Sequence, residues 1–421
     1  MISITNYILH IDVNSAYLSW TAAYRLQQGY ELDLRTVPAV VGGSEKSRHG
    51  IVLAKSMPAK KFNIITGESI RDAYQKCPKL ICVAPNYDLY MKASAAMVEI
   101  IREYSPKVQR FSIDECFVDY NDLATGRHAI DIAKEIRKRM WDELGFTVNI
   151  GVSTNKILAK MGSDFQKPDR VHTLFPNEIQ AKMWPLPVGD LFMVGSRTEA
   201  KLKGLGINTI GELAQTDVAL LSAHLKSHGY LVHAYANGID HSPVRKSNRE
   251  IVKGMGNSTT VRFNVEKRED ANLVLLSLAE SVGMRLRQAS VCAGLVSVSI
   301  RSTEFTGGGH QRKISVTTDS TTYIHKIAMQ LFDEMWDGQL IRKLGLRVSD
   351  LYSNDYVQLS LLEEFDFERQ KALDDTVDKI RGKYGSSAIH RASFLHSGLR
   401  PVTGGIQDDG EDEYPIMTCI L

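Results

Sequence analysis

Three acidic residues stand beside short strand-like runs in the first third of the chain. Asp12 lies in YILHIDVN, and the neighbours Asp114 and Glu115 lie in FSIDECFVD. If the fold gathers these carboxylates, a bound divalent cation relieves their mutual repulsion. Carboxylate oxygens suit Mg²⁺, which completes its shell with water and substrate phosphate. The pattern therefore predicts a two-metal site for phosphoryl transfer.

The elements that carry these residues must meet a geometric condition. Strand alternation places His10 and Asp12 on one face of the first run, opposite its apolar residues. In a straight strand Asp114 and Glu115 would point to opposite faces, so we expect them at the turn of a hairpin, with VQRFSI entering and CFVDY leaving. Taken alone, an acidic residue in such a place is more often capped or solvated than a metal ligand.

Length, composition and charge set broad limits. The chain has 421 residues, too many for one ordinary core, so about two to four domains are expected. With 43% hydrophobic and 24% charged residues it has the composition of a soluble globular protein. The formal net charge of +2 says nothing about nucleic acid. Acidic residues gather near the C-terminus, which leaves the basic runs KVQR, PVRKSNR and HQRKIS as candidate phosphate contacts, although such runs are usually solvated surface.

Cysteine usage and hydropathy bear on the compartment. The 5 cysteines are scattered without a CxxC pair, which argues against a disulfide framework or a zinc site and favours a reducing cytoplasm. No basic segment followed by an apolar one opens the chain, and no run of about 18 apolar residues occurs. We therefore expect a cytoplasmic protein that does not contact a membrane.

Apolar periodicity predicts an α+β organisation in several parts. Up to residue 184, the order strand, helix, hairpin, helix, strand and helix predicts a sheet with helices on one face, interrupted at 30–85 by a small mixed segment. Residues 253–352 read as strand, helix, strand, strand, helix and strand, with one sheet surface open to solvent. Beyond 353 come a short apolar peptide, a helix and a polar end that we expect to be disordered.

Glycine-punctuated short helices fill residues 185–235, and a polar tether follows at 236–252. The piece LFMVGSRTEAKLKGLGINTIGELA looks like a helix-hairpin-helix. Its turn at Val194 and Gly195 could present backbone N–H groups to a DNA phosphate, with Lys201 and Lys203 adding charge. An ordinary helical hairpin fits the same residues equally well.

Taken jointly, these segments resemble the Y-family translesion DNA polymerases over roughly residues 5 to 352. The resemblance is strongest to the bacterial DNA polymerase IV branch and the related catalytic subunit of polymerase V. It implies a right-hand polymerase with a palm (1–29 and 86–184), small fingers (30–85), a helix-hairpin-helix thumb (185–235), a linker (236–252), an α+β little finger (253–352) and a terminal segment (353–421). The implied activity is template-directed, low-fidelity addition of dNTPs to a primer across damaged template, by a monomer acting on primer–template DNA.

The same resemblance implies roles for the carboxylates. Two Mg²⁺ ions would be bound by Asp12 and Asp114, with the backbone carbonyl of Val13 as a further ligand. Glu115 would hold the ion nearest the primer 3′ hydroxyl. Tyr17 stands where the family keeps an aromatic steric gate against ribose, although by spacing alone a core aromatic is favoured.

The resemblance also implies contacts to the incoming triphosphate. Lys60 in SMPAKKF and Lys167 in DFQKPD match positions that contact it. Lys156 and Lys160, in GVSTNKILAK, are weaker candidates for the same contact, and facing solvent or DNA is the alternative.

The chain departs from the commonest family pattern in the fingers. Met57 replaces a usual tyrosine and Ala54 a usual threonine. Lys60 replaces a usual arginine and cannot make a planar bidentate contact. These departures leave the carboxylates untouched but predict a looser grip on the nucleotide.

The peptide QLSLL at 358–362 resembles the short motif by which bacterial polymerases bind the sliding clamp. Gln358 would hydrogen-bond at the rim of a cleft filled by Leu359, Leu361 and Leu362. Packing of this peptide on its own domain is the alternative.

Two other functions compete with the polymerase reading. A catalytically silent repair adaptor would bridge DNA and the sliding clamp, but such relatives lose palm carboxylates and all three are present here. A nucleotidyl cyclase uses a similar palm and two metals, but it has no purpose for a helix-hairpin-helix or a little finger.

Overall fold

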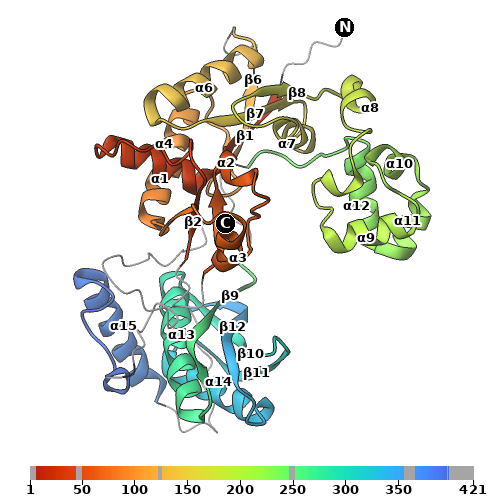
Figure 1. Ribbon diagram of the computed structural model, residues 1–421. Coiled ribbons are helices and arrows are strands. Elements are labelled where there is room, and N and C mark those ends of the chain that lie inside the picture. The colour runs from red at the N-terminus through yellow and green to blue at the C-terminus, as the bar shows by residue number, and fades with distance from the viewer. Residues whose placement is uncertain are drawn as a thin grey trace.

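The computed structural model describes residues 6–43, 50–121, 126–245, 252–354, 366–395 and 397. Over these ranges the chain forms a central five-stranded sheet, a small three-stranded sheet, a helical unit set to one side, and a four-stranded C-terminal sheet (Figure 1). None of the helices within these ranges combines the length and apolar character that crossing a membrane requires.

The central sheet has β1 in its middle, antiparallel to both neighbours. Its spatial order is β5 (Val108–Arg110), β6 (Glu115–Asn121), β1 (Asn6–Val13), β7 (Val148–Ser153) and β8 (Val171–Thr173). β5 and β6 form the expected hairpin, and β8 runs parallel to β7. The residues that alternate along β1 therefore face two separate layers.

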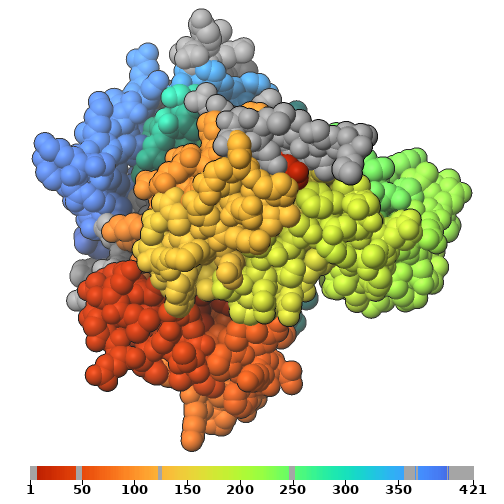
Figure 2. Space-filling model, turned by 90° about the horizontal axis from the view of Figure 1, so that it is seen from above, coloured from red at the N-terminus to blue at the C-terminus, as the bar shows by residue number. Residues whose placement is uncertain are grey.

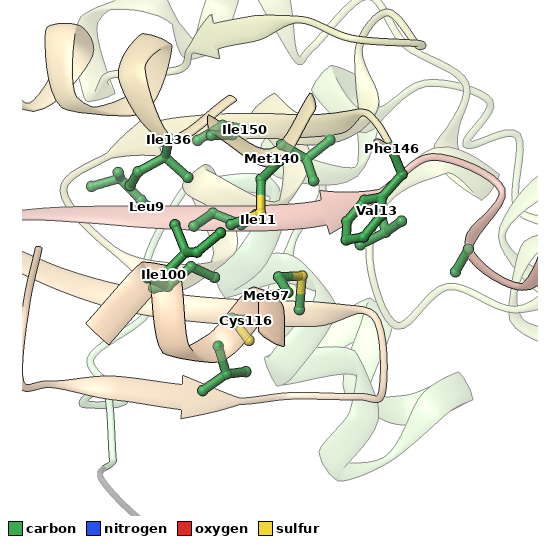
Figure 3. Packing of buried hydrophobic residues seen from close by; sticks show 14 of the residues in the cluster. Leu9, Ile11, Val13, Met97, Ile100, Cys116, Ile136, Met140, Phe146 and Ile150 are labelled. Carbon is green, nitrogen blue, oxygen red and sulfur yellow. The ribbon is translucent and has the colours of Figure 1, made fainter. Parts of the chain in front are cut away.

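One face of the central sheet packs on α1 (Ala16–Gln27), α4 (Tyr87–Arg102) and α6 (Ala129–Leu144). Figure 3 shows the apolar side chains of β1 among those of the helices, including Leu9, Ile11, Met97, Ile136 and Met140. The buried residues of α6 recur at intervals of three and four, which places them on one face of the helix: Ala129, Ile132, Ala133, Ile136 and Met140.

The expectation that helices cover only one face of this sheet is wrong. α7 (Lys156–Asp164) lies across the other face, on the side of His10 and Gly151. It comes so close that a Cβ on Gly151 would stand 1.9 Å from the carbonyl oxygen of Ala159. Because both faces are covered, all six residues of β7 are buried.

The small sheet has the order β3 (Val52–Lys55), β2 (Ala39–Gly42) and β4 (Ile81–Val83). β2 is antiparallel to β3 and parallel to β4. With α2 (Met57–Lys60) and α3 (Ile70–Lys76) it encloses a small core of its own.

The helical unit projects beside the central sheet (Figures 1 and 2). Its elements are η2 (Pro176–Glu178), α8 (Ile179–Lys182), η3 (Val188–Asp190), α9 (Ser196–Gly204), α10 (Ile210–Gln215), α11 (Val218–Leu225) and α12 (Ser227–Ala236). Its apolar core includes Ile157, Leu158 and Met161 from α7. α7 thus belongs to two units at once, with one side on the central sheet and another in the helical unit.

The C-terminal sheet has the element order that periodicity predicts. In chain order it contains β9 (Gly254–Val265), α13 (Arg268–Gln288), β10 (Val291–Ser302), β11 (Gly307–Thr318), α14 (Thr321–Met335) and β12 (Ile341–Ser353). The strands are antiparallel in the order β11-β10-β12-β9. α13 and α14 cover one face, and small polar residues of the other face remain open.

Among the described residues after this sheet, the chain forms α15 (Phe367–Tyr384) and η4 (Ala392–Phe394). α15 lies alongside α13, as the helix expected beyond residue 363 (Figure 1). The clamp-type peptide at 358–362 and the end of the chain from 398 lie outside the described residues.

Candidate active site

Strand register brings the backbone positions of the three predicted carboxylate residues together. Asp12 of β1 is paired with Glu115 of β6, and paired residues of an antiparallel ladder have Cα atoms only about 4.5–5.5 Å apart. The N–H of Val13 donates to the carbonyl of Asp114 at 3.1 Å. The hairpin turn is closed by the N–H of Phe111, which donates to the carbonyl of Glu115 at 2.9 Å. The turn thus carries Asp114 to the end of β1, as the sequence requires.

Asp12 is buried next to a single strong counter-charge. Its side chain accepts a hydrogen bond from the ammonium of Lys167, which also lies 2.8 Å from a carboxylate oxygen of Asp164. Burial raises the pKa of Asp12 to about 6, although Lys167 opposes that rise. Burial also raises the pKa of Asp114, whose carboxylate accepts from the hydroxyl of Ser112. In both carboxyl groups, the cost of burying the charged form outweighs the stabilisation that neighbouring groups give to it.

Each carboxylate oxygen of Glu115 has a different neighbour, Lys160 at Oε1 and His10 at Oε2. Lys160 donates to Oε1 at 2.9 Å, and Nε2 of His10 lies 3.8 Å from Oε2. Burial acts to raise the pKa of Glu115, but His10 and Lys160 together bring that pKa down to about 2. The ring of His10 is fixed on its other side, 2.8 Å from the hydroxyl of Ser163, and burial lowers its pKa.

Sequence reasoning left the role of Lys160 open, and the alternative that it faces solvent is wrong. The residue is 8% exposed and points at Glu115. A signal was available, because Lys160 and Ser163 are three residues apart on one face of a helix that must pack on the sheet. The Nζ atom of Lys156, one turn earlier, lies 3.4 Å from Oε1 of Gln109 and 3.3 Å from the carbonyl oxygen of Pro243.

The donor chemistry of this site fits a hard divalent cation. It offers carboxylate oxygens at three neighbouring positions. Burial raises the pKa of two of these carboxyl groups, those of Asp12 and Asp114. In the ranges that the structure describes, no three His, Cys, Asp or Glu side chains converge closely enough to hold an ion. Lys160 and Lys167 are instead the direct partners of Glu115 and Asp12, so each lysine acts as a resident counter-ion of a carboxylate.

Tyr17, the proposed gate, is part of an aromatic cluster at the start of α1. Its ring is stacked on that of Tyr90 with 4.5 Å between centroids and 8° between planes. Tyr87 meets it edge-on at 6.0 Å. Burial raises the pKa of Tyr17 to about 12, and the charges of Tyr87 and Asp114 add to the rise.

The residues expected to contact the triphosphate come from two elements. Lys167 is beside Asp12, whereas Lys60 is exposed at the end of α2, whose first residue is Met57. Lys55, at the end of β3, was missed by sequence reasoning. Its ammonium group donates to the carbonyl of Ile64 at 2.5 Å, and its pKa is lowered by burial and then by the charge of Lys60.

Comparison with known proteins identifies the family. Residues 11–164 match the impB/mucB/samB family, 252–361 match its C-terminal domain, and 176–207 match the IMS family HHH motif. DNA polymerase IV of Clostridium acetobutylicum is 46% identical over 388 residues, which cover 92% of this chain and 98% of that relative. DNA polymerase IV 1 of Bacillus subtilis is 35% identical over 390 residues, covering 92% and 93%. The chain belongs to the DNA polymerase IV branch of the Y-family polymerases.

The fold agrees with this assignment. A solved Y-family DNA polymerase chimera superposes with a TM-score of 0.71 at 20% identity, covering 83% of this chain and all of the chimera. As a Y-family polymerase, the protein is a DNA-directed DNA polymerase of the translesion class that acts on primer–template DNA and dNTPs. Membership also implies dependence on a divalent metal. The silent-adaptor alternative is not favoured.

The candidate DNA contacts of this polymerase lie around α9. Gly195 is its N-cap residue, and a Cβ there would meet nothing within 4 Å. Lys201 and Lys203 are exposed along α9, and Lys203 pairs with Glu199 at 2.7 Å. The first turn of α9 is therefore open to a ligand.

Proposed function

We propose that Asp12, Asp114 and Glu115 are the catalytic carboxylates of this polymerase, with two Mg²⁺ ions per active site. Asp12, Asp114 and the carbonyl of Val13 would hold both ions, and Glu115 would hold the one at the primer 3′ hydroxyl. When bound, the ions lower the pKa of that hydroxyl and neutralise charge on the triphosphate. The observation that carries this proposal is the β1–β6 register that pairs Asp12 with Glu115.

The chain's own cations and rings complete the site. Lys167 has a second carboxylate partner in Asp164, so it can leave Asp12 for a nucleotide phosphate without moving far. Lys60, exposed at the end of α2, would bind the same triphosphate. Tyr17, stacked on Tyr90, would occupy the space of a ribose 2′ hydroxyl.

The units of the fold then correspond to the parts of a right-hand polymerase. The central sheet is the palm, the small sheet the fingers, the helical unit the thumb and the C-terminal sheet the little finger. The first turn of α9, which follows Gly195, would contact a DNA phosphate, and Lys201 and Lys203 in its last turn would add positive charge. We expect the protein to act as a monomer in the cytoplasm.

The open face of the little finger is suited to a DNA backbone. One row across its four strands consists of small residues, Ser258, Gly345, Ser299 and Gly309. These residues line a groove. Basic side chains of the adjacent rows flank it, namely Arg301, Lys343 and Arg347. A groove lined by small residues and flanked by basic side chains lets DNA phosphates approach the strands.

The peptide QLSLL remains our candidate for binding the sliding clamp. Replacing Gln358 and Leu361 together with alanine should abolish stimulation of primer extension by the clamp and leave clamp-independent extension unchanged. Unaltered stimulation of the double variant would exclude this role.

Primer extension by Asp114→Ala tests the catalytic assignment. We expect a loss of at least about a hundredfold, because transition-state charge loses a stabilising partner. Affinity for primer–template, measured by fluorescence anisotropy, should remain. Asp119→Asn is the matched control, since Asp119 lies on the same hairpin but pairs with Lys107 at 3.0 Å. Extension that survives Asp114→Ala would disprove the assignment.

A further inference from the structure

We propose that Lys160 is a positioning residue that links the thumb to Glu115. Its ammonium group is the direct hydrogen-bond partner of Glu115 and lies against a ring of the thumb. The inference rests on the proposed role of Glu115 as a metal ligand, and it assigns to Lys160 a part that the carboxylates alone do not supply.

Lys160 sits where three structural parts meet. Its Nζ is 2.9 Å from Oε1 of Glu115. The same atom lies 5.7 Å from the ring centroid of Phe111, in the catalytic hairpin, and 5.5 Å from that of Phe192, in the loop before α9. A largely desolvated ammonium group depends on such partners, since water is not available to replace them.

The two rings belong to a longer aromatic path. Phe111 meets Phe117 of β6 at 5.3 Å and Phe192 at 6.0 Å, both edge-on. Phe192 in turn stacks on Tyr235 of α12 at 6.3 Å. Phe192 is three residues before Gly195, so the path runs from the catalytic hairpin into the thumb beside its candidate phosphate contact.

This arrangement makes the orientation of Glu115 sensitive to the thumb. If Phe192 shifts, the ring that the ammonium group of Lys160 contacts also shifts. The ammonium group then changes position, and its hydrogen bond to Oε1 of Glu115 changes with it. His10 cannot substitute for it, because its Nε2 lies 3.8 Å from the other oxygen, Oε2. Without Lys160, Oε1 would lose its hydrogen bond and Glu115 would be free to rotate.

Two opposite effects of Lys160→Met follow. Removing a resident counter-ion leaves the carboxylates less compensated, so the DNA-free protein should bind Mn²⁺ about fivefold more tightly. Loss of orientation should slow single-turnover primer extension about tenfold, with primer–template affinity within about twofold of the parent. A merely structural defect would not tighten metal binding. Lys160→Arg, which keeps the charge, should recover part of the rate.

The thumb link is tested by Phe192→Leu, which keeps apolar volume and removes the ring. We expect extension about threefold slower, and no further loss when it is combined with Lys160→Met, because both changes act on one path. Lys134→Met is the control: this lysine is exposed on α6 and pairs with Asp131 at 3.6 Å. It should change neither Mn²⁺ binding nor rate.

The outcomes separate this inference from the proposed function. Parent-like extension and Mn²⁺ binding by Lys160→Met, alongside an inactive Asp114→Ala, would overturn the positioning role alone. Losses that multiply in the double variant would overturn the link to the thumb. Parallel loss of rate, DNA affinity and melting temperature would reduce Lys160 to a structural residue. An active Asp114→Ala would instead overturn the proposed catalytic site.

Discussion

Asp12 shows how burial prepares a carboxylate for a cation. Taking the side chain out of water raises its pKa to about 6, and Lys167 offsets only part of this penalty. The ionised form therefore destabilises the metal-free fold above about pH 6, and protonation removes that cost at lower pH. The pKa of Glu115 is shifted in the opposite direction. Burial acts to raise it, but His10 and Lys160 lower it to about 2.

Metal binding by the DNA-free protein should therefore weaken in acid. A protonated Asp12 cannot be a ligand, and about one pH unit below its pKa nine-tenths of the molecules are protonated, so affinity should fall about tenfold between pH 7.5 and about pH 5. Titration with Mn²⁺ at the two pH values measures this. Asp12→Asn should remove most of the pH dependence, and an affinity that is the same at both values would contradict the prediction.

The stack of Tyr17 on Tyr90 should determine sugar selection. Tyr17→Ala should reduce the preference for dCTP over CTP by about ten- to a hundredfold, because the ring that excludes the 2′ hydroxyl is gone. Tyr90→Leu should reduce it less, by loosening the ring. Ratios of kcat/KM for the two nucleotides measure the effect. Tyr17→Phe keeps the ring and should keep the preference, so loss of selection in this control would exclude a steric mechanism.

At the scale of elements, α7 is the part that joins palm, thumb and catalytic site. It presents Lys160 and Ser163 to the site and Ile157, Leu158 and Met161 to the thumb core. Its approach to β7 depends on the missing side chain of Gly151.

Gly151→Ala should separate α7 from the sheet. The new Cβ would stand 1.9 Å from the carbonyl oxygen of Ala159 and 2.6 Å from the N of Ser163, and overpacking of this kind costs about 1–3 kcal/mol or more. Urea unfolding should show the loss, together with slower primer extension. Gly162→Ala is the control, because its Cβ would meet its nearest neighbours at 3.6 Å and alanine favours a helix. Equal stability of the two variants would refute the explanation.

α15 is fixed to the little finger by buried ion pairs. Glu280 of α13 is 3% exposed and accepts from Arg381 of α15 at 2.8 Å and from Arg391 at 2.7 Å. A second pair joins Arg287 of α13 to Asp378 of α15 at 2.7 Å. The chain thus returns to the little finger after the segment that contains the proposed clamp peptide.

Glu280→Ala should release this anchor. It leaves the buried guanidinium group of Arg381 without its carboxylate partner, which costs about 3–5 kcal/mol. Limited proteolysis should then cleave near α15 much faster, and the unfolding midpoint of the little finger should fall. Asp333→Ala, which breaks the exposed pair with Arg268 on the same domain, should leave both unchanged. Persistent protection of α15 in Glu280→Ala would show that apolar packing alone holds it.

At the scale of the whole molecule, the formal net charge is only +2, but the charged side chains are distributed unevenly. The little-finger groove is bordered by exposed basic side chains, whereas most acidic residues elsewhere in the described ranges pair with neighbouring cations. Grip on DNA should therefore come from a few phosphate contacts and not from overall charge.

Primer–template affinity should consequently decrease steeply with salt. Arg347→Met should weaken binding uniformly across sequences and reduce the slope of log K against log[salt] by about 1. Anisotropy titrations between low and moderate salt measure the slope. Lys134→Met, on an exposed position of α6, should leave it unchanged. A flat salt dependence of the parent would contradict phosphate-based grip.

Much of this site could be read from local sequence. Alternation in HIDV determines that His10 and Asp12 share a face, and the turn in FSIDE allows Asp114 and Glu115 to converge at the end of the neighbouring strand. The element order of the C-terminal sheet is equally local, because each strand and helix has its own periodicity. These features depend on residues only a few positions apart.

The tertiary structure alone decided what surrounds the carboxylates. β8 has only three residues, VHT, and gives almost no strand signal, so the parallel β7–α7–β8 crossover that puts α7 over the second face could not be foreseen. The pairing of Lys160 with Glu115, its contact with Phe192 and the return of α15 to the little finger depend on the same kind of long-range packing. Each joins residues tens of positions apart, and only the closed fold determines which of them meet.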